Sequence, residues 1–155
     1  GSEAAAVHRE GVQTRGDELS PAIRARLESA IIMPAVDYID TQRARRQFIE
    51  KMDEAMSDLD VLVTPSVPIQ TPTIEECTPP PGEADGPGGV GLTEFTGVFD
   101  TTGQPSLSLN CGFTQDGMPI GMMINGRAFD EVSVLRAGAA LERTLGLTGK
   151  RPPID

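Results

Sequence analysis

The stretch from residue 65 to residue 91 constrains the fold most, because seven prolines and five glycines fall within it. Proline lacks a backbone N–H and glycine loses the most entropy on ordering, so no helix or strand is expected there. A structureless stretch of this length is uncommon inside a compact domain. We therefore expect a linker or a functional loop, such as the wall or lid of a site.

Residues 3–59, before this stretch, have the periodicity of helices. Ser20 followed by Pro21 predicts a helix start, because the hydroxyl can cap the first turn and proline needs no N–H there. One apolar face follows at three- and four-residue spacing, through Ile23, Leu27, Ala30 and Ile31. Pro34 marks a break and the start of a second helix.

The second helix is predicted to be long and amphipathic, with about six turns. Its apolar stripe comprises Tyr38, Ala44, Phe48, Ile49, Met52, Ala55, Met56 and Leu59. Three arginines, Arg43, Arg45 and Arg46, fall mostly off this stripe. We interpret them as a solvated helix face rather than as an anion site.

Three short segments have the character of strands. Residues 60–64 form a β-branched apolar run that predicts a buried strand. Residues 106–109 alternate polar and apolar, and residues 120–124 are predicted to be a further strand that follows a turn at Asp116-Gly117. With the helices, these segments predict an α/β fold with at least three strands.

Two further helices are predicted in the last part of the chain. Residues 93–98 are expected to form a short helix capped by Thr93. Asp130 opens a longer helix that runs through Leu145, because an acidic start suits the helix dipole. Gly146 is placed to end that helix as a C-cap glycine.

The charge and length of the chain exclude several classes of protein. Acidic residues number 23 against 13 basic ones, which gives a formal net charge of −10. Nucleic-acid and anionic-membrane partners are therefore not expected, since they need a clustered positive face. No apolar run approaches the roughly 20 residues needed to cross a bilayer. The 155 residues, 38% of them apolar, predict one domain with a modest core.

The cysteines and the amino terminus bear on the cellular setting. Cys77 and Cys111 have no metal-motif spacing, so we expect two free, packed thiols and no metal site. Residues 1–2, Gly-Ser, are interpreted as the remnant of a tag, and no signal peptide is evident. A reducing, cytoplasmic location is the expectation.

Residue patterns alone identify no catalytic set. His8 is the single histidine, and no Gly-x-Ser-x-Gly elbow accompanies it, so a catalytic triad is not predicted. The glycines between residues 82 and 91 lack the Lys-Ser/Thr ending of a phosphate loop, and Glu83 and Asp85 would repel phosphate. The carboxylate pairs have no spacing that indicates acid–base work. No cofactor is predicted.

The second half of the chain, taken as one string, resembles the amidase signature family. Residues 59–66, L-D-V-L-V-T-P-S, are similar to that family's D-V-L-L-T-P-T element. Residues 95–108, F-T-G-V-F-D-T-T-G-Q-P-S-L-S, resemble its F-T-x-x-F-N-x-T-G-x-P-A-x-S segment. Cys111-Gly112 and the G-M-P-I-G-M of residues 117–122 resemble its C-G and G-L-P-V-G-L-Q elements. Many separate elements therefore agree, in the family's order.

The resemblance implies part of the amidase signature fold, a mixed β-sheet flanked by α-helices. Residues 3–155 would form the carboxy-terminal portion of a single amidase domain, with the Pro/Gly-rich loop at 65–91. The family's catalytic lysine, cis-serine and nucleophilic serine lie in a glycine- and serine-rich stretch that this chain lacks. Lys51 and Lys150 are the only lysines, and neither lies near paired serines and glycines. No catalytic residue is therefore assigned, and the chain is expected to be inactive alone.

The resemblance also implies four residues that line the substrate pocket: Thr93, Thr96, Phe99 and Asp100. A structural role stays open for two of them, with Phe99 in the core and Thr93 as a helix cap. Asp100 stands where the family usually has Asn, and a carboxylate can only accept hydrogen bonds. Thr93 stands where glutamine-using members tend to carry an acid, which favours a general amidase.

The implied parent cleaves the C–N bond of a small carboxylic amide to an acid and ammonia or an amine. The expected partners are the amide substrate and the missing amino-terminal part of the same domain. A truncated piece would also expose apolar surface and self-associate into homo-oligomers. Two alternatives are the amidase-like subunit of a glutamyl-tRNA(Gln) amidotransferase and a non-enzymatic interaction module on the same scaffold.

Overall fold

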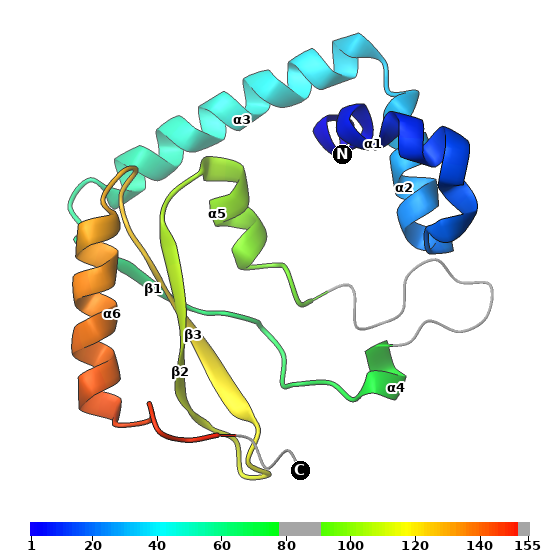
Figure 1. The fold of residues 1–155 in the computed structure, drawn as a ribbon. Coiled ribbons are helices and arrows are strands. Elements are labelled where there is room, and N and C mark those ends of the chain that lie inside the picture. The colour runs from blue at the N-terminus through cyan, green and yellow to red at the C-terminus, as the bar shows by residue number, and fades with distance from the viewer. Residues whose placement is uncertain (78–90, 152–155) are drawn as a thin grey trace.

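The computed structural model describes residues 1–77 and 91–151, and Figure 1 shows their arrangement. The elements in chain order are α1 (Ser2–Arg15), the 3-10 helix η1 (Gly16–Glu18), α2 (Pro21–Ile31), α3 (Ala35–Met56), β1 (Leu62–Pro65), α4 (Ile74–Cys77), α5 (Thr96–Thr102), β2 (Ser106–Phe113), β3 (Pro119–Asn125) and α6 (Glu131–Leu145). The α/β class predicted from the sequence is confirmed.

The described strands form one sheet in the order β1-β3-β2, with antiparallel pairing throughout. The predicted turn between β2 and β3 is present, since Gly117 has a φ of +85° and the Thr114 N–H bonds to the Met118 carbonyl at 2.9 Å. That positive φ is the reason for glycine at the turn. Both strands extend beyond the alternating residues 106–109 and 120–124.

One face of the sheet is apolar and packs under α6. Leu107 of β2 and Val63 of β1 both lie opposite Ile124 of β3, so the three side chains share this face. Ile124 is 2% exposed. A side chain added at Gly138 of α6 would run into Leu107, so the glycine allows the helix to approach the sheet closely.

The opposite face carries a polar cluster around Asn125, which is 0% exposed. Its side-chain oxygen accepts a hydrogen bond of 2.7 Å from the hydroxyl of Ser106 on β2. Its amide nitrogen donates to the Leu62 carbonyl at 3.1 Å and to the Thr64 hydroxyl at 3.4 Å, both on β1. One side chain thus ties the central strand to both neighbours.

Helix α6 has the predicted ends. The Asp130 carboxylate caps its first turn by accepting a hydrogen bond of 3.2 Å from the Ser133 N–H. Gly146 ends it in the left-handed conformation, with a φ of +62°.

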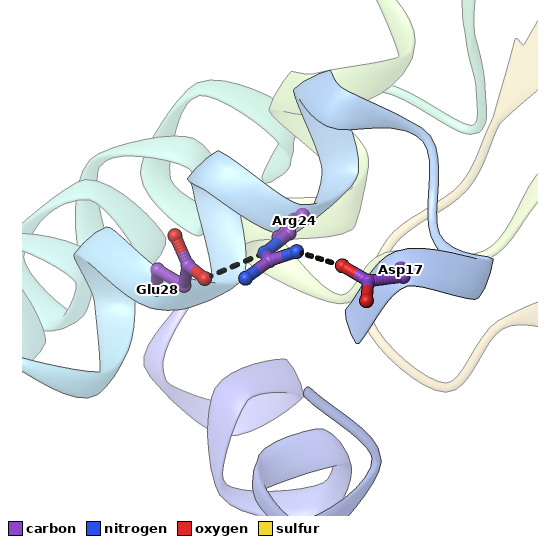
Figure 2. A network of polar contacts seen from close by, with 3 residues as sticks. All are labelled: Asp17, Arg24 and Glu28. Carbon is purple, nitrogen blue, oxygen red and sulfur yellow. Dashed lines mark hydrogen bonds and ion pairs between the residues drawn. The ribbon is translucent and has the colours of Figure 1, made fainter. Parts of the chain in front are cut away.

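Helices α1 and α2 form a hairpin through η1. The Ser20 hydroxyl accepts from the Ile23 N–H at 3.4 Å, which confirms the predicted helix start before Pro21. Figure 2 shows Arg24 between two carboxylates, Asp17 of η1 at 2.6 Å and Glu28 of α2 at 2.8 Å. The bonds to Glu28 and Asp17 raise the pKa of Arg24, and the pair ties η1 to α2.

Helix α3 begins after Pro34 and runs for 22 residues, as predicted, but much of its apolar stripe stays exposed. Met56 is buried, whereas Tyr38 and Phe48 remain accessible to solvent. The buried apolar side chains of the described residues are few: Ala5, Val12, Met56, Phe99, Met123, Ile124 and Val134. The core of the described part is therefore small.

The structure corrects two expectations about irregular and short segments. Within the Pro/Gly-rich stretch, residues 74–77 form the single turn of α4, where Thr73 and Glu76 bond reciprocally at its start. The rest of that stretch, residues 78–90, lies outside the described residues. The helix predicted at 93–98 instead spans Thr96–Thr102.

None of the helices in residues 1–77 and 91–151 is both long enough and apolar enough to span a bilayer. Helices accompany the sheet, as the resemblance implied. The strands in residues 1–77 and 91–151 are all antiparallel, so the mixed strand directions that the resemblance implied are not seen in this part of the chain.

Candidate functional site

The four residues predicted to line a pocket lie on or just before α5. The Thr93 carbonyl accepts hydrogen bonds from the Gly97 N–H at 2.9 Å and from the Thr96 hydroxyl at 3.3 Å. The N-cap of α5 is Phe95, with no side-chain capping bond. The prediction that the Thr93 side chain caps the helix is therefore wrong, because its backbone oxygen makes these contacts instead.

Helix α5 is amphipathic over its two turns. Phe99 is 6% exposed and belongs to the core, as does Thr102 one turn further on. Thr96 and Asp100 lie four positions apart on another face, where Asp100 is exposed. The structural role left open for Phe99 is thus the one that the structure supports, whereas Asp100 is exposed to solvent.

Asp100 lines a cleft of about 420 Å³ between α5, α3 and the start of α1. Tyr38, Thr41 and Gln42 of α3 line the opposite wall. The cleft therefore presents hydroxyl, amide and carboxylate groups, which can both donate and accept hydrogen bonds. Thr93, Thr96 and Phe99 do not line this cleft.

Helix α3 holds α5 in place through a guanidinium. Arg45 Nε donates a hydrogen bond of 2.7 Å to the carbonyl oxygen of Thr101, in the last turn of α5. Close to the same helix end, Gln104 Nε2 lies 3.5 Å from Asp53 Oδ1 of α3. The interpretation of the three arginines as a solvated face is wrong for Arg45, because its guanidinium bonds to α5. A cation at this place is also favourable, since the C-terminal end of a helix dipole is negative.

The sequence reasoning missed a pair of hydroxyls on the polar face of the sheet. Ser66 Oγ and Ser108 Oγ lie 2.7 Å apart across Gly121, and a Cβ at Gly121 would come 2.9 Å from Ser66. Glycine in the family-like G-M-P-I-G element was the available signal. No basic side chain in residues 1–77 and 91–151 bonds to either hydroxyl.

His8 and the cysteines take no part in a catalytic arrangement within the described chain. His8 is exposed on α1 and lines a groove of about 710 Å³ between α1 and α2, beside Val12, Leu19 and Leu27. Cys77 and Cys111 are free thiols, as predicted, but the expectation that both are packed is wrong for Cys77, which is exposed. No cluster of three metal-ligating side chains occurs among the residues that the structure places.

Comparison with known proteins identifies the family. The family model described as Amidase matches residues 2–135. The chain is 32% identical over 154 residues to an amidase of Pseudomonas putida, and the match covers 98% of this chain and 33% of that protein. It is 34% identical over 116 residues to a glutamyl-tRNA(Gln) amidotransferase subunit of Brevibacillus brevis, over 74% of this chain and 22% of that protein.

The fold agrees with solved structures of the same kind. The structure of 6-aminohexanoate cyclic dimer hydrolase superposes with a TM-score of 0.79 at 28% identity, over 88% of this chain and 30% of that one. The chain therefore belongs to the amidase signature family. It spans about a third of the length of the curated amidase that it matches, at 33%.

Proposed function

We propose that this chain supplies one wall of the substrate pocket in an amidase-type hydrolase, which cleaves a carboxylic amide to an acid and ammonia or an amine. The observation that carries the proposal is the placement of Asp100 in the cleft between α5 and α3. The family membership supports the reaction class.

The proposed part of Asp100 is to orient the substrate. An ionised carboxylate accepts hydrogen bonds only, so it suits an N–H or O–H group of the amide. Thr96 does not line the cleft, and its hydroxyl donates to the Thr93 carbonyl, so this part is proposed for Asp100 alone. Arg45 and the buried Phe99 fix the helix that presents Asp100.

The acyl-transfer chemistry is assigned to residues outside this chain. A serine nucleophile attacks the amide carbonyl only when a neighbouring base takes its proton. The two lysines of the chain are not placed for this: Lys51 lies on α3, and Lys150 lies 4.9 Å from the centre of the Phe113 ring. We therefore propose that the chain alone does not hydrolyse amides.

An activity comparison tests this function. A longer chain of the same gene, including a lysine and a glycine- and serine-rich segment, is expected to turn over simple primary amides, whereas the 155-residue chain is not. Asp100→Asn in the longer chain is expected to raise KM more than it lowers kcat, since Asp100 binds rather than reacts. Turnover by the 155-residue chain that disappears with Ser108→Ala would refute the proposal.

A second candidate function is that of the amidase-like component of a glutamyl-tRNA(Gln) amidotransferase, which the likeness to the Brevibacillus brevis protein favours. The residue at position 93 argues against this function, because Thr93 is uncharged and cannot form an ion pair with the amino group of glutamine. Glutaminase activity of the longer chain, with co-purifying partner proteins, would establish this alternative.

The third hypothesis is an independent interaction module. It predicts a monomer with a cooperative melt and little exposed apolar surface. The exposed apolar stripe of α3 argues against it.

A further inference from the structure

The layer that covers the apolar face of the sheet stops short of β1. Val63 lies directly opposite Ile124 on the face that packs under α6, yet Val63 is 51% exposed while Ile124 is 2% exposed. Helix α6 packs on β2 and β3. Figure 1 shows α6 as a single helix beside the sheet. The described residues therefore leave this face of β1 partly uncovered beside α6.

A groove of about 650 Å³ lies beside this position, between α6 and residues 60–61, which lead into β1. The helix contributes small side chains to the wall of the groove, at four- and three-residue spacing: Ser133, Ala137 and Ala140. Small side chains allow a second helix to approach to the usual interaxial distance of about 8–10 Å. The groove thus has the shape of a helix-packing site.

Two cations flank the groove without a described partner. Arg136 and Arg143 both line it, seven residues and so about 10.5 Å apart along α6. Neither forms an ion pair or hydrogen bond with any residue in the described part of the chain. In a chain with a net charge of −10, two such arginines on one helix edge are complementary to carboxylates from elsewhere.

The rest of α6 also has the character of a covered helix. Its outer side exposes Val132 at 65% and Leu135 at 60%, although its inner side already packs on the sheet. A helix that is apolar on both sides is typical of an interior position. The whole chain exposes 11344 Å², about half as much again as the roughly 7,500 Å² of a compact monomer of 16.4 kDa.

We propose that the groove between α6 and β1 receives an amphipathic helix that carries two carboxylates about two turns apart, one for Arg136 and one for Arg143. This helix would come from the remaining part of a longer amidase chain. That source rests on the proposed function and on the amidase relative, of which this chain covers 33%. Asp60, on the β1 side of the groove, can accept a cation from the same helix.

A second copy of this chain fits the groove less well. An antiparallel two-fold pairing along this side of α6 brings the same edge of each helix together. It would place Arg136 of one copy near Arg143 of the other, and like charges in such a pairing are destabilising.

The test uses the 155-residue chain and two synthetic helical peptides of about three heptads. Both peptides have one leucine stripe; one carries two glutamates seven positions apart beside it, and the other carries lysines there. Fluorescence anisotropy gives the two dissociation constants, and amide NMR shifts locate the binding site. We expect the glutamate peptide to bind about tenfold more tightly and to shift the signals of Ser133, Ala137 and Ala140.

The charge-reversed variant R136E/R143E is expected to prefer the lysine peptide. The matched control R9E/R46E has the same net charge and changes two exposed arginines on α1 and α3, so it should keep the wild-type preference. Equal affinities for the two peptides, no binding near about 1 mM, or a preference unchanged in R136E/R143E would overturn the proposal. A homodimer that R136E/R143E dissociates would overturn it in favour of a second copy.

The source of the helix is tested with the longer amidase chain. In that chain the groove is expected to be occupied by the chain's own helix, so the glutamate peptide should not bind. Tight peptide binding by the longer chain would show that the occupant is a separate protein. Peptide binding does not depend on amide hydrolysis. If the proposed function is wrong, the longer chain will not hydrolyse amides, while the 155-residue chain will still prefer the glutamate peptide.

Discussion

Arg45 Nε and the carbonyl oxygen of Thr101 lie 2.7 Å apart, and this hydrogen bond joins the long helix α3 to the last turn of α5. Under the proposed function, the bond positions Asp100, because α5 carries that residue. Arg45→Ala is expected to lower the free energy of unfolding by about 1 kcal/mol and to speed hydrogen exchange of the α5 amides. Arg46→Ala, on an exposed neighbouring position, is the control. Unchanged exchange in α5 would contradict the tether.

Asn125 is expected to be the most sensitive polar residue of the sheet. Asn125→Ala removes a fully buried side chain and leaves the Ser106 hydroxyl and the Leu62 carbonyl without that partner. The expected loss is about 2–3 kcal/mol, measured by urea unfolding. Ser108→Ala, at an exposed position, should cost clearly less. A loss below about 0.5 kcal/mol for Asn125→Ala would mean that water replaces the three bonds.

Gly138 and Gly11 form a matched pair of helical glycines. Alanine favours helix over glycine by about 1 kcal/mol, so Gly11→Ala, where nothing lies within 4 Å of the new Cβ, should raise the melting temperature. Gly138→Ala should lower it, because the Cβ would collide with Leu107 and overpacking costs about 1–3 kcal/mol. Stabilisation by both substitutions would show that α6 does not pack on β2 as described.

Asp130 makes part of the stability depend on pH. The hydrogen bonds from the hydroxyl and the backbone N–H of Ser133 hold the pKa of Asp130 below its ordinary value. A carboxyl whose pKa is lower in the folded state stabilises the fold at pH values above its pKa in the unfolded chain, about 3.9. This contribution disappears as the pH falls through the pKa of the folded state.

Asp130→Asn is therefore expected to lower the melting temperature at pH 6 and to have little effect at the most acidic pH at which the chain still folds. Thermal melts of both proteins across this range give the difference curve. Asp58→Asn, at an exposed carboxylate that forms no ion pair or side-chain hydrogen bond within the described part of the chain, is the control for general charge effects. A difference that grows toward acid would contradict the sign derived for Asp130.

Local chemistry made much of the fold predictable. Ser20-Pro21, Asp130 and Gly146 mark helix ends through bonds and backbone angles within one turn. Gly117 marks the hairpin turn for the same reason. These signals depend on near neighbours in the chain, and at these four positions no tertiary contact reversed them.

The candidate site was predictable only in part. The resemblance brought Asp100 forward, and the structure places it in a cleft with residues of α3. The role of Arg45 was missed because its partner, Thr101, lies 56 positions further along the chain. The Ser66–Ser108 contact, 42 positions apart, was missed for the same reason, because strand register decides which hydroxyls meet.

The sequence by itself determined the α/β class, the start of α2, both ends of α6, the hairpin turn and the family, since each depends on short-range patterns or on motif order. Only the tertiary structure decided the burial of Asn125 and the use of Arg45. It also decided which apolar faces remain uncovered, at α3, Val63 and the outer side of α6. Burial depends on which surfaces meet across the whole fold. The periodicity of a sequence predicts an apolar face but does not predict which other element packs against that face.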